Sequence, residues 1–463
     1  MGPTIEADYL VVGAGAMGLA FIDTLVSETT ATVVVVDRND QPGGHWTTAY
    51  PFVRLHQPSA YYGVNSLHLG SDTIDQGGLN AGYYELASGA EVCAYFDAVM
   101  RQHLLPTGRV TYLPMSEYLG DGQVRTLGGE EIQVTARRVV TSHVEIIVPS
   151  MRRPSYTVAD DVDCVPPNDL PRIREARDRY VIVGAGKTAM DTCLWLLRHG
   201  IAPQRLTWIK PRDSWILDRA AVQPGSQFAK RVLRDFSSQL AAVVEAESLP
   251  DLFDRLEAKG CLTRIDTSID PTMYRCAILS QAELEELRRI EDVVRMGHVQ
   301  SIEPGRVTLE DGALDVDGSV LYIDCSADGF AHLEPATVFR GDHISLQAVR
   351  TCQPAFSAAV IAHVEATYPD DETRNAFCGP VPYPRVPTDW LRMMLAFNKN
   401  QVQWFSDPDM MAWVDGARLN VLHHVTAAVS ERAREKIISV LTSQLPSIND
   451  KLETLLAQAE VTA

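Results

Sequence analysis

Two glycine-rich turns, each directly after a short apolar strand and at the start of a helix, constrain this chain most strongly. The first is Gly13-Ala14-Gly15-Ala16-Met17-Gly18, after an apolar run at 8–12, and the second is Gly184-Ala185-Gly186-Lys187-Thr188-Ala189, after a run at 180–183. In such a turn the glycines allow a tight bend, the approach of a pyrophosphate and the close packing of helix on strand. The pattern predicts two βαβ dinucleotide-binding folds in one chain.

An acidic residue completes the first pattern. Asp37 ends the strand predicted at 32–36, about 20 residues after the turn, where a carboxylate can accept hydrogen bonds from both ribose hydroxyls. The phosphates would meet the free N–H groups at the start of the helix. The residues expected to contact the first nucleotide are Gly13, Gly15, Ala16, Met17, Gly18, Asp37 and Arg38.

The second pattern has basic residues in place of the acid. Its next strand, predicted at 205–209, is followed by Lys210, Pro211 and Arg212. A carboxylate there would repel a 2′-phosphate, whereas Lys210 and Arg212 would attract one, so we expect NADPH at this site rather than NADH. A solvated basic pair is the alternative reading. The expected contacts are Gly184, Gly186, Lys187, Thr188, Ala189, Lys210 and Arg212.

Charge and cysteine usage narrow the functional class. The net charge of −19 over 463 residues argues against nucleic acid and against docking on anionic lipid. The N-terminus has no basic leader, and the apolar stretch at 9–26 is broken by glycines and Asp23, so a cytoplasmic protein without a membrane span is expected. The eight cysteines include no closely spaced pair, which predicts reduced thiols and neither a zinc site nor a redox dithiol.

The rest of the chain fits an α/β protein. The two glycine turns, about 170 residues apart, resemble those of the flavin-dependent oxidoreductases with two dinucleotide-binding domains, and this resemblance implies that an NAD(P)H domain is inserted into an FAD domain. We expect the first part of the FAD domain at 1–165, an NADPH domain with a helical insertion at 166–315, the second part of the FAD domain at 316–390 and a helical C-terminal region at 391–463. The segment 110–140 alternates apolar and polar residues like a small antiparallel meander, and 425–457 is patterned as an amphipathic helix that packs on the protein or forms a dimer face.

A motif after Asp37 adds a family resemblance. Gly43-Gly44-His45-Trp46, with Tyr50-Pro51 and Arg54-Leu55 further on, resembles the flavin-containing and Baeyer–Villiger monooxygenases, over about residues 5–345. The resemblance implies that Gly44, His45 and Trp46 run along the FAD towards its flavin ring. It also implies an Asn or Asp beside the flavin, for which Asn65 is the candidate. A turn-forming role for Asn65 stays open.

The sequence also departs from these families. The Baeyer–Villiger fingerprint is not visible before the second turn, and Val140-Thr141-Ser142-His143 stands where the families have an A-T-G motif. Disulfide reductases share both glycine turns but need a cysteine pair beside the flavin, so the lack of a close pair disfavours that branch.

The reaction implied by the resemblance is an NADPH-dependent monooxygenation. NADPH would reduce FAD, and a C4a-peroxyflavin would oxygenate a nitrogen, sulfur or carbonyl carbon of a small organic substrate with O₂. Asn65, His56 and Arg212 are the candidate catalytic residues, although a lone histidine is more often structural. No metal is expected, since His423 and His424 are adjacent and would diverge on a helix. An FAD-dependent amine or alcohol dehydrogenase or oxidase, and a non-catalytic flavin-binding redox sensor, are the alternatives; a homodimer is possible in each case.

Overall fold

The first glycine turn follows the first strand of the largest of the five sheets that the described residues form. The computed structural model describes residues 2–423 and 430–462. Five strands of this sheet run parallel in the order β3-β2-β1-β6-β22. They are β1 (Thr4–Val12), β2 (Val33–Val36), β3 (Val110–Leu113), β6 (Glu131–Ser142) and β22 (His343–Leu346), with β21 (Phe339–Arg340) antiparallel at the edge. The four valines of β2 are all buried, as a strand covered on both faces requires.

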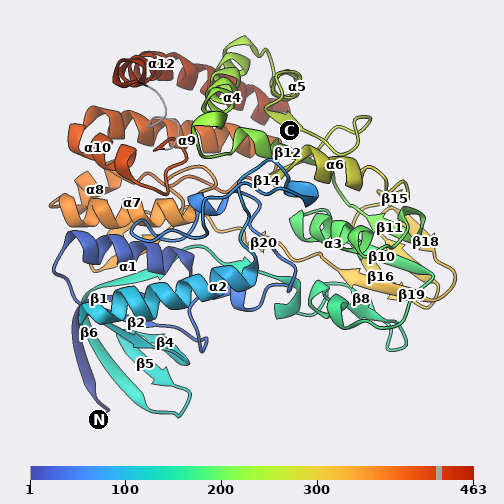
Figure 1. The fold of residues 1–463 in the computed structure, drawn as a ribbon, viewed down its shortest axis with the longest axis horizontal. Coiled ribbons are helices and arrows are strands. Elements are labelled where there is room, and N and C mark those ends of the chain that lie inside the picture. Colours follow the sequence, from blue (N-terminus) through green and yellow to red (C-terminus); the bar gives the residue numbers. More distant parts are fainter. Residues whose placement is uncertain (1, 424–429, 463) are drawn as a thin grey trace.

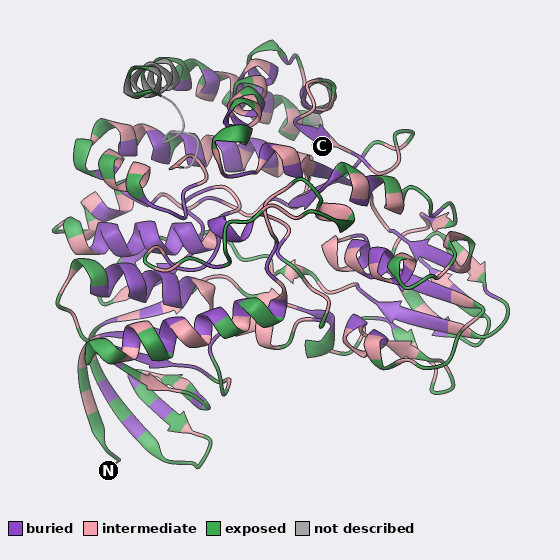
Figure 2. Ribbon diagram, viewed as in Figure 1, coloured by how far each residue is buried: buried purple, intermediate pink, exposed green. Residues whose placement is uncertain are grey.

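Two helices cover one face of this sheet, as Figure 1 shows. They are α1 (Ala16–Glu28) and α7 (Pro354–Thr367), which pack on each other and are buried along most of their length (Figure 2). The segment between β2 and β3 holds α2 (Gly89–Ala98) and a π-helical turn (Val99–Leu104) after a long irregular stretch.

The predicted meander is present in β4 (Ser116–Gly120), β5 (Gln123–Thr126) and β6, which pair antiparallel in that order. Its exposed side chains alternate with buried ones along β6 (Figure 2). The first strand of the predicted segment, β3, instead pairs parallel with β2 in the main sheet. Alternation of polarity cannot distinguish these two pairings.

The second glycine turn opens a five-stranded parallel sheet in the order β15-β11-β10-β19-β9. Its strands are β9 (Cys164–Val165), β10 (Arg179–Val183), β11 (Leu206–Ile209), β15 (Val293–Val294) and β19 (Val320–Asp324), with α3 (Lys187–Arg198) and α6 (Gln281–Leu287) packed together beside it. The domain boundary expected at 316 therefore lies elsewhere. β19 pairs with β10, and the chain rejoins the first sheet only at β21 and β22.

The chain passes between the two sheets twice, and the two passages are hydrogen-bonded to each other. β7 (Ile146–Ile147), on the way out, pairs antiparallel with β20 (Gly329–Phe330), on the way back. Two smaller sheets flank the second domain. One is β13-β12-β14 and the other is β18-β17-β16-β8. Their strands are β8 (Thr157–Val158), β12 (Ser214–Asp218), β13 (Leu262–Thr263), β14 (Met273–Leu279), β16 (Val299–Glu303), β17 (Arg306–Leu309) and β18 (Gly312–Asp315).

In Figure 1 a layer of helices lies above α7 and α1. It contains the predicted helical insertion, α4 (Ser226–Glu245) and α5 (Leu249–Ala258), together with α9 (Pro387–Ser406), α10 (Pro408–Gly416) and α12 (Glu431–Thr462). α8 (Asp371–Phe377) connects α7 to this layer. The helix predicted at 425–457 corresponds to α12 from Glu431 onwards; residues 425–429 and His424 lie outside the described residues.

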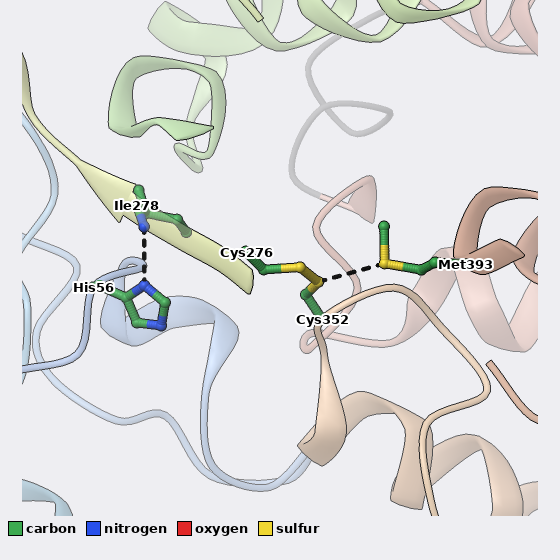
Figure 3. The surroundings of a disulfide bond; sticks show 5 residues. All are labelled: His56, Cys276, Ile278, Cys352 and Met393. Carbon is green, nitrogen blue, oxygen red and sulfur yellow. Dashed lines mark hydrogen bonds between the residues drawn. A yellow bond between two sulfur atoms is a disulfide. The ribbon is translucent and has the colours of Figure 1, made fainter. Parts of the chain in front are cut away.

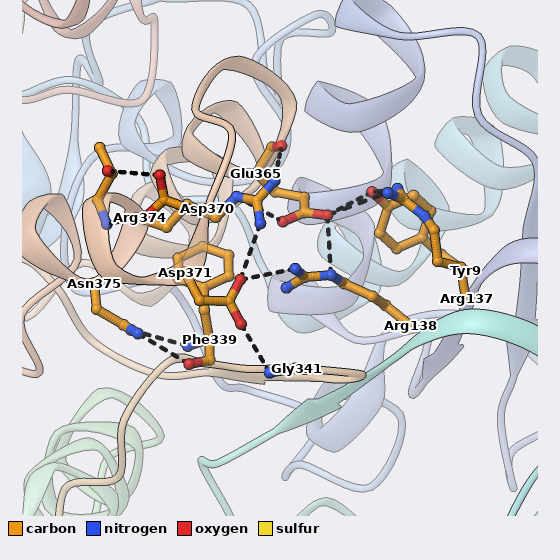
Figure 4. A network of polar contacts seen from close by, with 11 residues as sticks. Tyr9, Arg137, Arg138, Phe339, Gly341, Glu365, Asp370, Asp371, Arg374 and Asn375 are labelled. Atoms are coloured by element: carbon orange, nitrogen blue, oxygen red, sulfur yellow. Dashed lines mark hydrogen bonds and ion pairs between the residues drawn. The ribbon is translucent and has the colours of Figure 1, made fainter.

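A buried carboxylate joins α7 to the first sheet, as Figure 4 shows. Glu365 has no exposed side-chain surface and lies 3.4 Å from Arg138 of β6 and 3.2 Å from Arg374 of α8. The Tyr9 hydroxyl of β1 donates a 2.7 Å hydrogen bond to it. Burial and the Glu365 carboxylate raise the pKa of Tyr9 well above its usual range. Breaking such a buried ionic cluster typically costs about 3–5 kcal/mol, because it leaves uncompensated charge.

Candidate functional site

The two glycine turns have nearly the same backbone geometry. Gly13 and Gly184 have φ of 106° and 133°, a region that favours glycine. Gly15 and Gly186 begin α1 and α3 with φ −83° and ψ near −177°, and neither helix has a side-chain cap. Free N–H groups therefore remain at both helix starts, where the helix dipole also favours an anion.

Close packing explains the third glycine of the first turn. A Cβ on Gly18 would lie 2.1 Å from the carbonyl oxygen of Gly13, so only glycine fits between helix and strand. Asp37 follows β2 and is buried; its Oδ2 accepts a 2.5 Å hydrogen bond from Ala14 N, and its Oδ1 accepts a 2.7 Å bond from Asn39 N. The predicted acid thus lies directly beside the turn.

One cavity of about 1140 Å³ connects the first turn to the second domain. It is lined by every residue expected to contact the first nucleotide and by Gly44, His45 and Trp46. Gly44 is within reach of the turn, since a Cβ on it would lie 3.1 Å from Gly15 Cα. The Trp46 indole donates to the Tyr62 hydroxyl at 2.7 Å, and burial lowers the pKa of His45 to about 4. The structure therefore gathers both N-terminal motifs around one cavity.

Lys187, the first residue of α3, is the contact between this cavity and the second turn. Its ammonium pairs with Asp191, which also accepts a 2.7 Å hydrogen bond from the Tyr50 hydroxyl. Lys187, Asp191 and Tyr50 all line the cavity. Gly184, Gly186, Thr188 and Ala189 are not among its described lining residues.

Lys210 does not fit the expected phosphate contact. Lys210 comes directly after β11, just as Asp37 comes directly after β2. However, its side chain is only 2% exposed. Its ammonium donates a 2.5 Å hydrogen bond to Asp213 and lies 4.6 Å from the centre of the Trp208 ring. Arg212 is half-buried, and its Nε has no hydrogen-bond partner. Of the two basic residues, Arg212 is the one that forms no ion pair with a carboxylate among the described residues.

The candidate catalytic residues are separated by the fold. His56 lines the cavity, and its Nδ1 accepts a 3.2 Å hydrogen bond from Ile278 N (Figure 3), so the neutral ring carries its proton on Nε2. Burial, then the charges of Lys187 and Arg219, lower the pKa of His56 to about 3. Asn65 is not among the described residues that line the cavity, and its side chain accepts a hydrogen bond from Leu419 N at 3.3 Å.

Several cavity residues carried no recognisable sequence signal. Asp235 of α4 lines the cavity; burial raises its pKa to about 6, and its Oδ1 has no hydrogen-bond partner. Arg275 and Arg350 also face the cavity, and Arg350 makes no ion pair with any carboxylate among the described residues. The apolar wall consists of Leu346, Tyr383, Trp390, Met393, Met394 and Phe397.

The prediction that all cysteines are reduced and that no pair lies near the first site is wrong. Cys276 and Cys352 form a disulfide across a separation of 76 residues, and both line the cavity (Figure 3). The six others, Cys93, Cys164, Cys193, Cys261, Cys325 and Cys378, are free. Sequence spacing could not reveal the pair, because the fold alone brings its two segments together.

Within 2–423 and 430–462, no helix is both long and apolar enough to cross a membrane. In the same ranges, no group of three or more His, Cys, Asp or Glu side chains is arranged to hold a metal ion.

The fold and cavity define a protein with two dinucleotide-binding folds that open on one space. The sequence model of the NAD(P)-binding Rossmann-like domain matches residues 11–74. The solved structure of OTEMO in complex with FAD and NADP is similar with a TM-score of 0.50, at 14% identity over 78% of this chain and 83% of that one. An oxidized steroid monooxygenase bound to NADP also has a TM-score of 0.50, at 15% identity over 78% and 85%.

Sequence relatives place the chain more narrowly. It is 55% identical to the uncharacterized protein Rv2000 of Mycobacterium tuberculosis and to the uncharacterized protein Mb2023 of Mycobacterium bovis, over 99% of this chain and 86% of each relative. The chain belongs to the family of these mycobacterial proteins.

Proposed function

We propose that this chain is an NADPH-dependent flavin monooxygenase that oxygenates a nitrogen, sulfur or carbonyl carbon of a small organic substrate. The observation that carries the proposal is the single cavity that reaches from the uncapped start of α1, past Gly44–Trp46, to Lys187 at the uncapped start of α3. A site for each of two dinucleotides, opening on one space, is what hydride transfer between them requires.

The residues present fit FAD at the first turn. The N–H groups of the first turn of α1 have no side-chain partner, Asp37 lies beside them, and Gly15 and Gly44 leave room that a Cβ would fill. At the second turn, the same uncapped geometry and the unused donor of Arg212 favour NADPH. The relation to structures bound to FAD and NADP supports both assignments.

The residues around the cavity have separate tasks in this proposal. FAD held at the first glycine turn beside Asp37 would supply the redox chemistry between NADPH and O₂. The aromatic and thioether side chains of α9 and Tyr383 bind the apolar part of a substrate and exclude water. His56 donates from Nε2 in a neutral ring. The Asp235 carboxyl, whose pKa is raised to about 6, keeps its proton up to about pH 6 and accepts one above it.

Flavin content and reduction test the proposal. We expect one FAD per purified chain, bleaching by NADPH under nitrogen at a lower concentration than by NADH, and O₂ uptake that a ketone, sulfide or amine from a small panel stimulates with formation of its oxygenated product. The Gly15→Ala variant should lose FAD, because the added Cβ occupies the approach to the helix N-terminus. Gly77→Ala, in an exposed loop where a Cβ meets nothing within 4 Å, is the matched control.

Each of the other possible results of these flavin measurements would favour a different function. Bound FAD that neither NADPH nor NADH reduces, but that an amine or alcohol does, would indicate a dehydrogenase or oxidase. Bound FAD that no reductant of either class reduces would indicate a redox sensor. A chain that binds no flavin would refute all three flavoprotein readings.

A further inference from the structure

The Cys276–Cys352 disulfide lies at the edge of the first sheet where the nucleotide is proposed to bind. Cys352 stands between β22 and α7, and β22 is separated from β1 only by β6. Neighbouring strands are about 4.8 Å apart, so the carboxyl ends of β1 and β22 lie about 10 Å apart. Ligands of open α/β sheets bind at this edge. The disulfide and the first glycine turn share one cavity.

The other half of the disulfide comes from an irregular point in β14. β14 pairs with β12 through Tyr274 opposite Trp215 and Ile278 opposite Leu217, so the residues between them oppose a single residue, Ile216. Cys276 lies in the middle of this bulge with φ 54°. Bulges redirect side chains, and they are common beside functional sites. Here the bulge turns the Cys276 side chain towards the loop that carries Cys352 (Figure 3).

The backbone at both cysteines is unusual. Cys352 has φ 52°, and the two cysteines are among only five described non-glycine residues with positive φ. Left-handed backbone conformations at bulky residues concentrate at functional sites, where the surrounding structure holds them in place. A purely stabilising cross-link has no need for such a conformation at both ends.

The surroundings suit a thiolate at Cys352. Arg350, two residues earlier, is a buried cation that also faces the cavity, and the start of α7, directly after Cys352, has no side-chain cap. A nearby cation and a helix N-terminus both stabilise a thiolate. Cys352 is also the more exposed of the two cysteines, and Met393 Sδ lies 3.8 Å from its sulfur (Figure 3).

We propose that Cys276 and Cys352 form a redox-active pair that accepts electrons from the reduced flavin and passes them to an external disulfide. This inference rests on the proposed binding of FAD and NADPH. Two electrons from reduced flavin and two protons cleave the S–S bond, giving two thiols and oxidised flavin. The Cys352 thiolate then attacks an external disulfide R–S–S–R and releases one RSH; Cys276 attacks the mixed disulfide, releases the second RSH and restores the Cys276–Cys352 bond.

The first test counts electrons and thiols in the same anaerobic sample. We expect two equivalents of NADPH per FAD for full reduction of the wild-type protein, and one for Cys276→Ser/Cys352→Ser. Alkylation in denaturant followed by peptide mass spectrometry should label Cys276 and Cys352 only after NADPH is added. Cys164→Ala, a half-buried free cysteine outside the described cavity lining, should keep two equivalents.

The outcomes separate this inference from the proposed function. Flavin bleached by one equivalent, with both cysteines still linked, would overturn the redox pair and leave the monooxygenase proposal intact. If NADPH does not bleach the flavin, photoreduction of the flavin delivers the electrons instead, and labelling of the two cysteines still decides the transfer step. A chain without flavin, or a wild-type protein in which the two cysteines are already free, would overturn the inference.

The second test measures the exchange step. With dithiobis(nitrobenzoate) as the probe disulfide, NADPH should drive steady release of thionitrobenzoate by the wild-type and Cys164→Ala proteins. We expect at least a tenfold lower rate for Cys352→Ser and for the double variant. Equal rates in all four proteins would show that the pair is a structural cross-link only.

Discussion

The sharpest prediction concerns Gly186, where stability and nucleotide binding should respond in opposite directions to one methyl group. Gly186 begins α3 with φ −83° and ψ −177°, which alanine adopts without strain. A Cβ there meets no atom within 4 Å. Gly186→Ala should therefore fold normally, and the unfolding free energy should rise by about 0.4–1 kcal/mol because the unfolded chain loses freedom.

The same methyl group should impair NADPH binding. It lies where the backbone has to approach the pyrophosphate, so it separates the phosphate from one or two N–H groups of α3. Hydrogen bonds to charged groups contribute about 1.5–3 kcal/mol each, and about 1.4 kcal/mol is tenfold in affinity. We expect the dissociation constant for NADPH to rise by about 10- to 100-fold.

Thermal unfolding with and without NADPH measures both effects. The variant without nucleotide should melt at or slightly above the wild-type temperature, and the upward shift caused by NADPH should nearly vanish. Gly77→Ala should match the wild type in both respects. Gly184→Ala provides the contrast, because its φ is 133° and its Cβ would lie 2.6 Å from the Cys325 carbonyl oxygen, so it should fold poorly. Wild-type NADPH affinity in a stable Gly186→Ala protein would refute the assignment of the second turn.

Three further predictions follow from particular side chains. Arg212→Gln should raise the KM for NADPH about tenfold and leave that for NADH nearly unchanged, as steady-state kinetics with both nucleotides will show. Glu365→Gln should lower the unfolding free energy by about 3 kcal/mol in urea titrations, while the KM for NADPH stays at the wild-type value. Because the pKa of His56 in the folded protein is about 3, its ring stays neutral until the pH approaches that value. An unfolded histidine already binds a proton near pH 6.5. The unfolding free energy should therefore fall as the pH drops below 6.5, by up to about 1.4 kcal/mol per pH unit, and this slope should be shallower in His56→Asn.

Local patterns predicted the parts of the protein that local structure determines. The sequence predicted both glycine turns, the acid after β2 and the motif at Gly43–Trp46, because each depends on residues close in sequence. Local patterns did not predict which sheet each strand joins. β19 lies within the range 316–390 that was expected for the FAD domain, but it pairs with β10 of the other sheet.

Side-chain environments were the least predictable feature. The burial of Lys210 depends on Asp213 and on the packing of Trp208, so its charge alone suggested a phosphate contact that the fold does not offer. Asn65 contacts Leu419, far along the chain. The disulfide depends on a bulge in one strand and a loop after another. Such pairings follow from tertiary structure, which a single sequence does not display.

Because β7 pairs with β20, the two chain segments that connect the domains form a single hydrogen-bonded hinge. Because the outgoing and returning segments are hydrogen-bonded at Ile146–Ile147 and Gly329–Phe330, a rotation of one sheet against the other bends both at the same place. Residues 144–146 and 329–330 also line the cavity. Any such rotation therefore changes the width of the cavity at the hinge, while the glycine turns, each within its own sheet, move as rigid parts.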